Sequence, residues 1–202
     1  YLTSYEIIFP IPSSILLNKK SDFHLIVEIH SNEKNNFQKT LKNIFKKNLA
    51  EIIIIENNLK NSWIWRKREQ LVHIQKELNY NHKFDISLPL SQWKNFILKI
   101  NKFTKKNTQF TSYFFGHLGD GNLHCNFKVE NELKKDINIL SEFIYDLTLS
   151  LNGSIAAEHG LGQKKNMLLK KYKSKEYYDF LKNLKNYLDP KKNLGVNKLF
   201  KS

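Results

Sequence analysis

The sequence has little cysteine, arginine or proline and no long hydrophobic run. One cysteine in 202 residues cannot form a disulfide framework, which favours a reducing compartment, and we expect a cytoplasmic protein. The longest apolar run, residues 52–55, is far too short to span a bilayer. Residues 1–4 have neither the basic nor the apolar region of a signal peptide. Because the chain begins with Tyr1 rather than Met, we expect it to be a piece of a longer protein.

Arginine is scarce against a background of lysine. Of 33 basic residues only Arg66 and Arg68 are arginines, and the formal net charge is +14. The lysines are spread along the chain among Asn and Ile, as biased base composition would produce, so we expect no nucleic-acid partner. A basic nucleic-acid-binding module stays open as a weaker alternative. An arginine in such a background indicates a site that needs a planar, forked cation.

Apolar periodicity predicts an α+β fold: an antiparallel sheet with helices packed on one face, in ferredoxin-like repeats, followed by C-terminal helices. A hydrophobic content of 41% is enough for a core. Residues 1–22, with Pro10 and Pro12, look irregular. Strands are expected over 23–30, 51–55, 83–88, 108–115 and 122–129, and helices over 33–48, 63–78, from the cap Ser91 onward, 132–151, 163–171 and 174–187.

The stretch that organises the chain reads Gly-His-Leu-Gly-Asp-Gly-Asn-Leu-His-Cys-Asn over residues 116–126. Asp-Gly between two apolar runs is a strong hairpin signal, and a two-residue type I′ turn at Asp120-Gly121 would place His117 directly opposite His124. Directly opposed side chains share one face, so the two imidazoles could close on one metal ion. The hairpin alone leaves an alternative open, a pair of surface histidines beside a tight turn.

A second motif, Gly-Ser-Ile-Ala-Ala-Glu-His-Gly-Leu-Gly, occupies residues 153–162. Its small residues let backbone approach a bound group closely. Glu158 could be a third metal ligand, which leaves a position open for substrate, and His159 would be free to act as a base. Alone, a Glu-His pair is a weak indication of a site, because such a pair usually lies in a solvated loop.

Together the two motifs resemble the C-terminal domain of FAD-linked oxidases of the vanillyl-alcohol-oxidase type, which include D-lactate, glycolate and D-2-hydroxyglutarate dehydrogenases. The sequence Ala-Glu-His-Gly-Leu-Gly is most similar to that of the D-2-hydroxyglutarate dehydrogenase branch. Upstream, Trp-Arg-Lys-Arg-Glu over residues 65–69 and Lys-Phe-Asp-Ile-Ser-Leu-Pro over 83–89 also match the family's pattern. The resemblance covers nearly all of residues 1–202, which would be the substrate and metal domain. The family's N-terminal FAD-binding domain is expected to be absent from this chain.

The resemblance implies FAD as cofactor, and a divalent metal, expected to be zinc, held by His117, His124 and Glu158. It further implies that His159 is the general base and that three residues bind the substrate's carboxylate and hydroxyl groups: Arg68, Lys83 and Asn126. The partners would be a small 2-hydroxy acid and a FAD-binding domain in cis or in trans. Outside these sets, Asp120 is expected to form the turn and Cys125 to be packed.

Two departures from the family pattern keep a second hypothesis open. The family's Asn-Pro-Gly turn near the end is replaced by residues 195–197, and Val72 stands where the closest branch often has a hydroxyl residue. The first hypothesis is an FAD-dependent enzyme that oxidises a D-2-hydroxy acid to the 2-oxo acid. The second is a catalytically idle remnant of such an enzyme.

Overall fold

The computed structural model describes residues 2–9, 23–29, 39, 43, 63–163, 165–196 and 198–200. The chain divides into two compact units, Tyr1–Ile155 and Ala156–Ser202. The expected strand over 51–55 lies outside the described residues. So does the expected helix over 33–48, apart from the helical Lys39 and Asn43.

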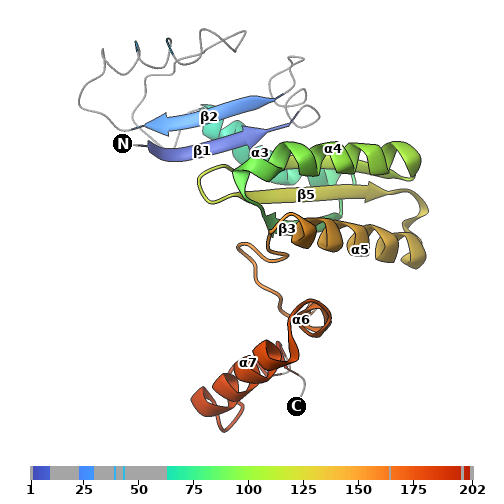
Figure 1. The fold of residues 1–202 in the computed structure, drawn as a ribbon. Coiled ribbons are helices and arrows are strands. Elements are labelled where there is room, and N and C mark those ends of the chain that lie inside the picture. Colours follow the sequence, from blue (N-terminus) through green and yellow to red (C-terminus); the bar gives the residue numbers. More distant parts are fainter. Residues whose placement is uncertain are drawn as a thin grey trace. The chain divides into compact units, whose positions relative to one another are not determined.

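The first unit is built on a five-stranded antiparallel sheet (Figure 1), which confirms the predicted α+β class. Its spatial order is β2-β1-β4-β5-β3. The strands are β1 (Leu2–Ile8), β2 (His24–Ile29), β3 (His82–Ser87), β4 (Phe110–His117) and β5 (Asn122–Val129).

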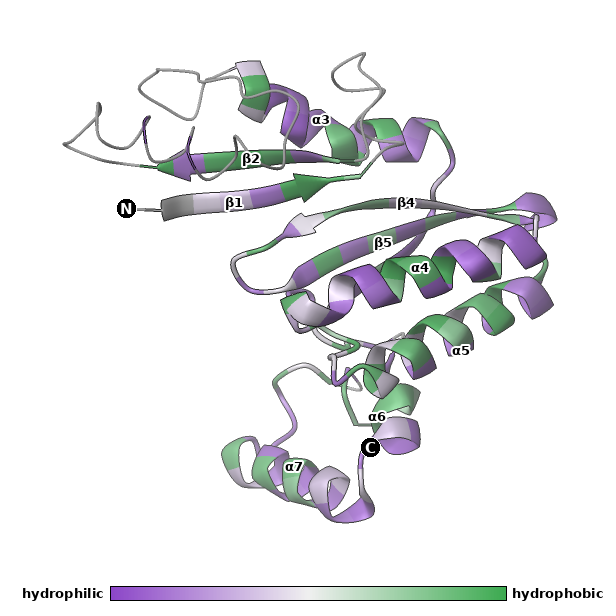
Figure 2. Ribbon diagram, turned by 45° about the horizontal axis from the view of Figure 1, so that its top comes forward, coloured by the Kyte–Doolittle hydropathy of each residue, from purple (hydrophilic) through white to green (hydrophobic). Residues whose placement is uncertain are grey.

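Helices cover both faces of this sheet, rather than the one face that the sequence predicted (Figures 1 and 2). On one face lie α4 (Leu90–Lys106) and α5 (Lys134–Ser150). A short 3₁₀ turn, η1 (Glu130–Glu132), precedes α5. The Phe103 ring of α4 stacks on Phe110 of β4 and on Phe143 of α5, and these aromatic contacts hold the layer together. On the opposite face lies α3 (Trp63–Glu77), whose buried Leu71 packs with Tyr113. The candidate site lies on the α3 face.

Strand β1 is a correction to the prediction that residues 1–22 are irregular. It runs antiparallel between β2 and β4, and Ile8, 1% exposed, belongs to the core on the α3 face. Two features hid this strand in the sequence. The prolines that follow suggested a loop, and Glu6, which is buried beside Ile8 on the same face, is charged and breaks the apolar alternation. A short strand with a buried acid carries too little periodicity to be recognised.

The start of α4 also differs from prediction. Ser91 was expected to cap the helix, but the helix begins at Leu90, with Pro89 at the N-cap position and no side-chain cap. Pro89 lies just outside the helix, with ψ at 132°, and the N–H that proline lacks takes no part in the helical hydrogen bonds, so the helix can begin immediately after it. The Pro89 carbonyl accepts from the Gln92 N–H at 2.8 Å.

The predicted register of the β4–β5 hairpin is wrong by two residues. His124 lies opposite Phe115, and His117 lies opposite Asn122. The turn spans four residues, 118–121, rather than two. A type I′ turn needs a positive φ at both Asp120 and Gly121, but only Gly121 has one, 75°. Asp120 forms the turn as expected: its Oδ1 accepts from the Asn122 N–H at 3.0 Å. Since side chains alternate with period two, the shift leaves both histidines on one face.

The second unit contains α6 (Asn166–Tyr172) and α7 (Lys175–Leu188), near the expected positions. Ser174 caps α7 by accepting from the Tyr177 N–H at 3.2 Å. Asp189 closes its C-terminal end by accepting from the backbone N–H groups of Asn193 and Leu194, each at 2.9 Å. In the part of the chain that the structure describes, no helix has the length and apolar character needed to cross a bilayer.

The close approach of β4 to its neighbours at Gly116 generates a stability prediction. A Cβ there would lie 2.3 Å from the Asn122 carbonyl oxygen and 3.2 Å from the Trp93 ring. We expect Gly116→Ala to lower the free energy of unfolding by about 1–3 kcal/mol through overpacking, measured by equilibrium denaturant unfolding. Gly119→Ala is the matched control, since nothing lies within 4 Å of its Cβ position. Equal midpoints for the two variants would contradict this account.

Candidate metal centre

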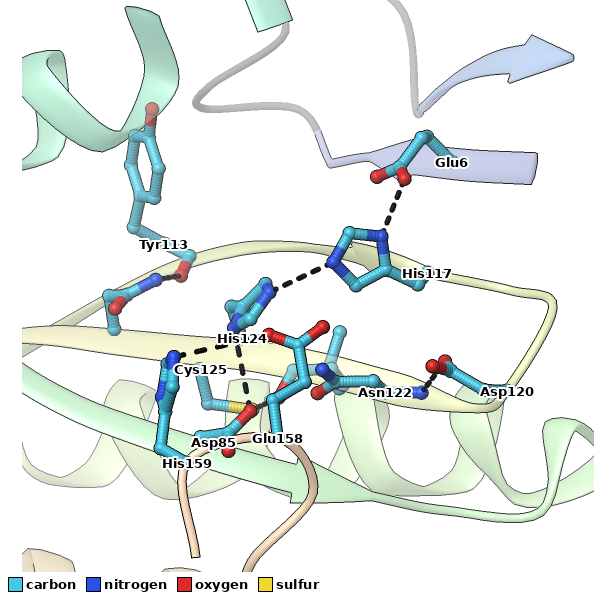
Figure 3. Close-up of polar contacts among 12 residues, drawn as sticks. Glu6, Asp85, Tyr113, His117, Asp120, Asn122, His124, Cys125, Glu158 and His159 are labelled. Atoms are coloured by element: carbon cyan, nitrogen blue, oxygen red, sulfur yellow. Dashed lines mark hydrogen bonds and ion pairs between the residues drawn. The ribbon is translucent and has the colours of Figure 1, made fainter. Parts of the chain in front are cut away.

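Two histidines from the hairpin meet on the α3 face of the sheet (Figure 3). The Nε2 atoms of His117 and His124 are 3.3 Å apart. That separation is long for a hydrogen bond. It equals the spacing of two imidazole nitrogens on one tetrahedral zinc ion, because Zn–N bonds of about 2.0–2.1 Å at the tetrahedral angle put the nitrogens about 3.3–3.4 Å apart. The donor pair therefore fits zinc.

A carboxylate lies behind each imidazole. Glu6 on β1 is paired with His117, and its Oε1 lies 2.5 Å from His117 Nδ1. Asp85 on β3 is paired with His124, and its Oδ1 lies 3.7 Å from His124 Nδ1. Both rings thus turn Nδ1 toward an acid and Nε2 toward each other, and metal-ligating histidines are commonly held by such carboxylates.

Glu6 is also bound to Arg68 of α3. Arg68 Nε and Nη2 donate to Glu6 Oε2 at 3.2 and 3.0 Å. Burial alone would raise the pKa of the Glu6 carboxyl, but the hydrogen bond with His117 and the charge of Arg68 outweigh it, so the pKa is lowered. The Arg68 guanidinium also lies over the Phe115 ring, 5.1 Å from its centroid. The arginine singled out by scarcity is thus held between an acid and an aromatic ring.

The other two residues expected to bind substrate lie on the same face of the sheet. Lys83 is exposed on β3 and is paired with Asn126 on β5. Asn126 is 2% exposed, and its Nδ2 donates to the Tyr113 carbonyl at 3.4 Å. The sheet therefore places Lys83 and Asn126 on the same face as the histidine pair, two residues along their strands from Asp85 and His124.

Glu158 and His159 belong to the second unit. Both are exposed, and His159 Nε2 lies 3.9 Å from Glu158 Oε2. Their roles as third ligand and base stay predictions.

Sequence reasoning missed three polar residues beside the histidines. Glu6 lay in a segment expected to be irregular, and Asp85 lay in a matched motif without a role. Asn122 is 1% exposed and paired with His117, and both of its amide atoms lack a hydrogen-bond partner among the described residues. A lone acid within an apolar strand, as in Phe84-Asp85-Ile86, is the signal that could have revealed Asp85.

Cys125 is packed as expected. It is fully buried on the opposite face of β5, where burial, and then the charge of Asp85, raise the pKa of its thiol. A thiol of this kind stays protonated and does not ligate a metal readily.

One face of the antiparallel sheet carries two histidines, each with a carboxylate behind it. The structure therefore defines an α+β domain that could hold a metal ion and a small molecule with a carboxylate group. Residues 11–199 match the family described as FAD linked oxidases, C-terminal domain. The chain belongs to this family, as the two motifs indicated.

Curated relatives agree with the family. D-2-hydroxyglutarate dehydrogenase from Rattus norvegicus is 28% identical over 179 residues, 86% of this chain and 33% of that protein. The Bos taurus protein of the same name is 33% identical over 67% of this chain and 25% of its own length. A putative D-lactate dehydrogenase from Schizosaccharomyces pombe is 30% identical over 86% of this chain and 36% of its own length. The chain thus spans about a third of the length of the relatives it matches.

The expectation of a cytoplasmic protein is wrong in the light of these relatives. The rat, bovine and Schizosaccharomyces pombe proteins are all named as mitochondrial. The expectation rested on a single cysteine, and a low cysteine content indicates only a reducing environment, without distinguishing one such compartment from another.

The fork between Arg68 and Glu6 predicts that lysine cannot replace this arginine. The Arg68 side chain is 13% exposed and that of Glu6 8%, and two donors meet one oxygen. We expect Arg68→Lys to lower the free energy of unfolding by about 1–2 kcal/mol, because an ammonium group does not reproduce a planar pair of donors. The control is Arg66→Lys, which changes an exposed arginine and should stay within about 0.5 kcal/mol of wild type. Thermal and denaturant unfolding check both, and equal losses would refute a special role of the fork.

Proposed function

We propose that this chain is the substrate- and metal-binding part of an FAD-dependent dehydrogenase that oxidises a D-2-hydroxy acid to the 2-oxo acid. The observation that carries the proposal is the histidine pair, with Nε2 atoms 3.3 Å apart and a carboxylate facing each Nδ1. Family membership supports the flavin, and the relatives' names support the substrate class of 2-hydroxyglutarate or lactate.

In this proposal His117 and His124 hold a divalent metal, zinc by its fit to the nitrogen spacing, and Glu158 is the third protein ligand. Chain connectivity supports Glu158. Ser154 forms an antiparallel bridge with Ser87, the last residue of β3, with N–H to O distances of 2.9 and 2.8 Å. Four residues further on, Glu158 can lie at most about 14 Å from that anchor. Three protein ligands leave a position for substrate, as catalytic zinc sites require.

The remaining residues bind and orient the acid. Arg68 uses two of its five N–H donors on Glu6, and the other three are of the right kind to hold a substrate carboxylate. Lys83 and Asn126, on the same face, would bind the substrate's other carboxylate or hydroxyl oxygens. All three lie in the first unit, so the binding surface is a property of the sheet and α3.

The chemistry then needs one proton acceptor from this chain. When bound, the metal would lower the pKa of the substrate hydroxyl and the flavin would accept the C2 hydride. His159 would take the hydroxyl proton on a ring nitrogen, since a neutral imidazole suits that role near neutral pH. Flavin contacts would come from a FAD-binding domain in cis or in trans.

The first test of the proposal is metal binding. We expect His124→Ala to weaken zinc binding more than 100-fold while the circular dichroism spectrum stays that of the wild type, because one of the two hairpin ligands is lost. His73→Ala, which removes an exposed histidine of α3, is the matched control and should bind zinc like the wild type. Full zinc occupancy in His124→Ala by metal analysis would refute the ligand assignment.

The second test is turnover. The chain is co-expressed with a FAD-binding domain of a relative, and flavin bleaching is followed with D-2-hydroxyglutarate, D-lactate and glycolate. We expect reduction by at least one acid, and His159→Ala should keep zinc but slow reduction at least 100-fold, the usual contribution of a general base.

The same experiment separates the alternatives. No reduction by any acid with zinc present would favour the catalytically idle remnant over an enzyme. Wild-type rates in His159→Ala would exclude His159 as the base, and His73→Ala controls for the loss of a histidine as such.

A further inference from the structure

The Glu6 carboxylate joins three elements that are far apart in sequence. Its Oε1 faces His117 Nδ1 on β4 at 2.5 Å, and its Oε2 accepts from Arg68 on α3 at 3.0 and 3.2 Å. Figure 3 shows Glu6 reaching from β1 to the side of the His117 ring that is turned away from His124. We infer that Glu6 is a positioning residue, which fixes the His117 tautomer and ring orientation for metal binding and at the same time sets where Arg68 is held. This inference rests on the proposed function and deepens it.

The tautomer follows from hydrogen-bond chemistry. A carboxylate can only accept, so the short contact requires a hydrogen on His117 Nδ1. In the neutral ring the other nitrogen, Nε2, then has a free lone pair, which is what a metal ligand needs. Nε2 is also the nitrogen that faces His124. Glu6 thus fixes the tautomer and the ring rotation of His117 from the Nδ1 side.

The Arg68 contact is the second half of the same device. The Glu6 side chain is 8% exposed, so a charge there needs compensation, and Arg68 supplies it with two donors. The same carboxylate therefore ties a candidate substrate-binding cation to a candidate metal ligand. A displacement of Glu6 would move both.

A glutamine at this position separates positioning from simple packing. The amide has nearly the shape of the carboxylate but only one acceptor oxygen. The Arg68 cation attracts that oxygen, which leaves the amide NH₂ facing His117. An N–H donor facing Nδ1 stabilises the tautomer that carries its hydrogen on Nε2. In that tautomer Nε2 must lose its hydrogen before it can bind a metal.

The test is zinc affinity, measured by competition with a chromogenic chelator at pH 8. We expect Glu6→Gln to weaken zinc binding about 10–100-fold, the usual effect of removing the carboxylate behind a metal-bound histidine. Glu69→Gln is the matched control, because it removes one exposed carboxylate of α3, adjacent to Arg68 in sequence, and should leave zinc affinity unchanged. Glu6→Asp, which keeps the acceptor on a shorter arm, should recover part of the loss.

A second measurement does not depend on metal, and its wild-type part does not depend on any variant folding. Nitrogen-15 correlation spectra of the wild-type imidazoles show which ring nitrogen carries hydrogen. We expect hydrogen on His117 Nδ1 in the wild type and in Glu69→Gln, and on Nε2 in Glu6→Gln. A role limited to structure would lower stability without exchanging the tautomer.

The outcomes are distinct. Zinc affinity in Glu6→Gln within twofold of wild type, with His124→Ala still defective, would overturn this inference and leave the proposed function standing. A wild-type His117 without hydrogen on Nδ1 would also overturn it. A wild type that binds no zinc would overturn the metal part of the proposed function and this inference with it.

Discussion

A carboxylate withdrawn from water needs donors that replace the hydrogen bonds and charge screening it has lost. Glu6 is such a group, and its two oxygens are directed to His117 and Arg68. The constraint couples three elements. β1 must pair with β4 in the register that brings Glu6 beside His117, α3 must present Arg68, and the imidazole cannot turn freely. Satisfying one buried acid therefore also sets the geometry of the candidate centre.

The part of the site that the sequence revealed is the part held together locally. His117 and His124 are seven residues apart, and a hairpin signal between them was enough to place both on one face. The register error of two residues did no harm, because side chains alternate with period two, whereas an error of one would have separated the rings. Glu6 could not be found in this way. Its partner is 111 residues away, and a single acid in a short strand beside prolines has no periodic pattern.

The glycine-rich motif shows how one pattern can serve two purposes. Its small residues suggested close approach of backbone to a bound group. At Gly153 the structure supplies a different neighbour: a Cβ there would lie 2.5 Å from the Ser87 carbonyl oxygen and 2.8 Å from a methyl group of Thr148. The glycine thus lets the chain lie against the end of β3, where Ser154 pairs with Ser87. Sequence alone could not distinguish approach to a ligand from approach to the protein's own sheet.

The position of β1 in the sheet also has a consequence for biosynthesis. Glu6 leaves the ribosome first, Arg68 follows 62 residues later and His117 111 residues later. β1 lies between β2 and β4, so its second edge stays open until the β4–β5 hairpin has been made. Pairing over such sequence separations is slow, because a long loop must close before any contact forms. The Glu6 carboxyl therefore lacks one donor until Arg68 has been made and the other until His117 has been made, so the candidate centre cannot form before the β4–β5 hairpin.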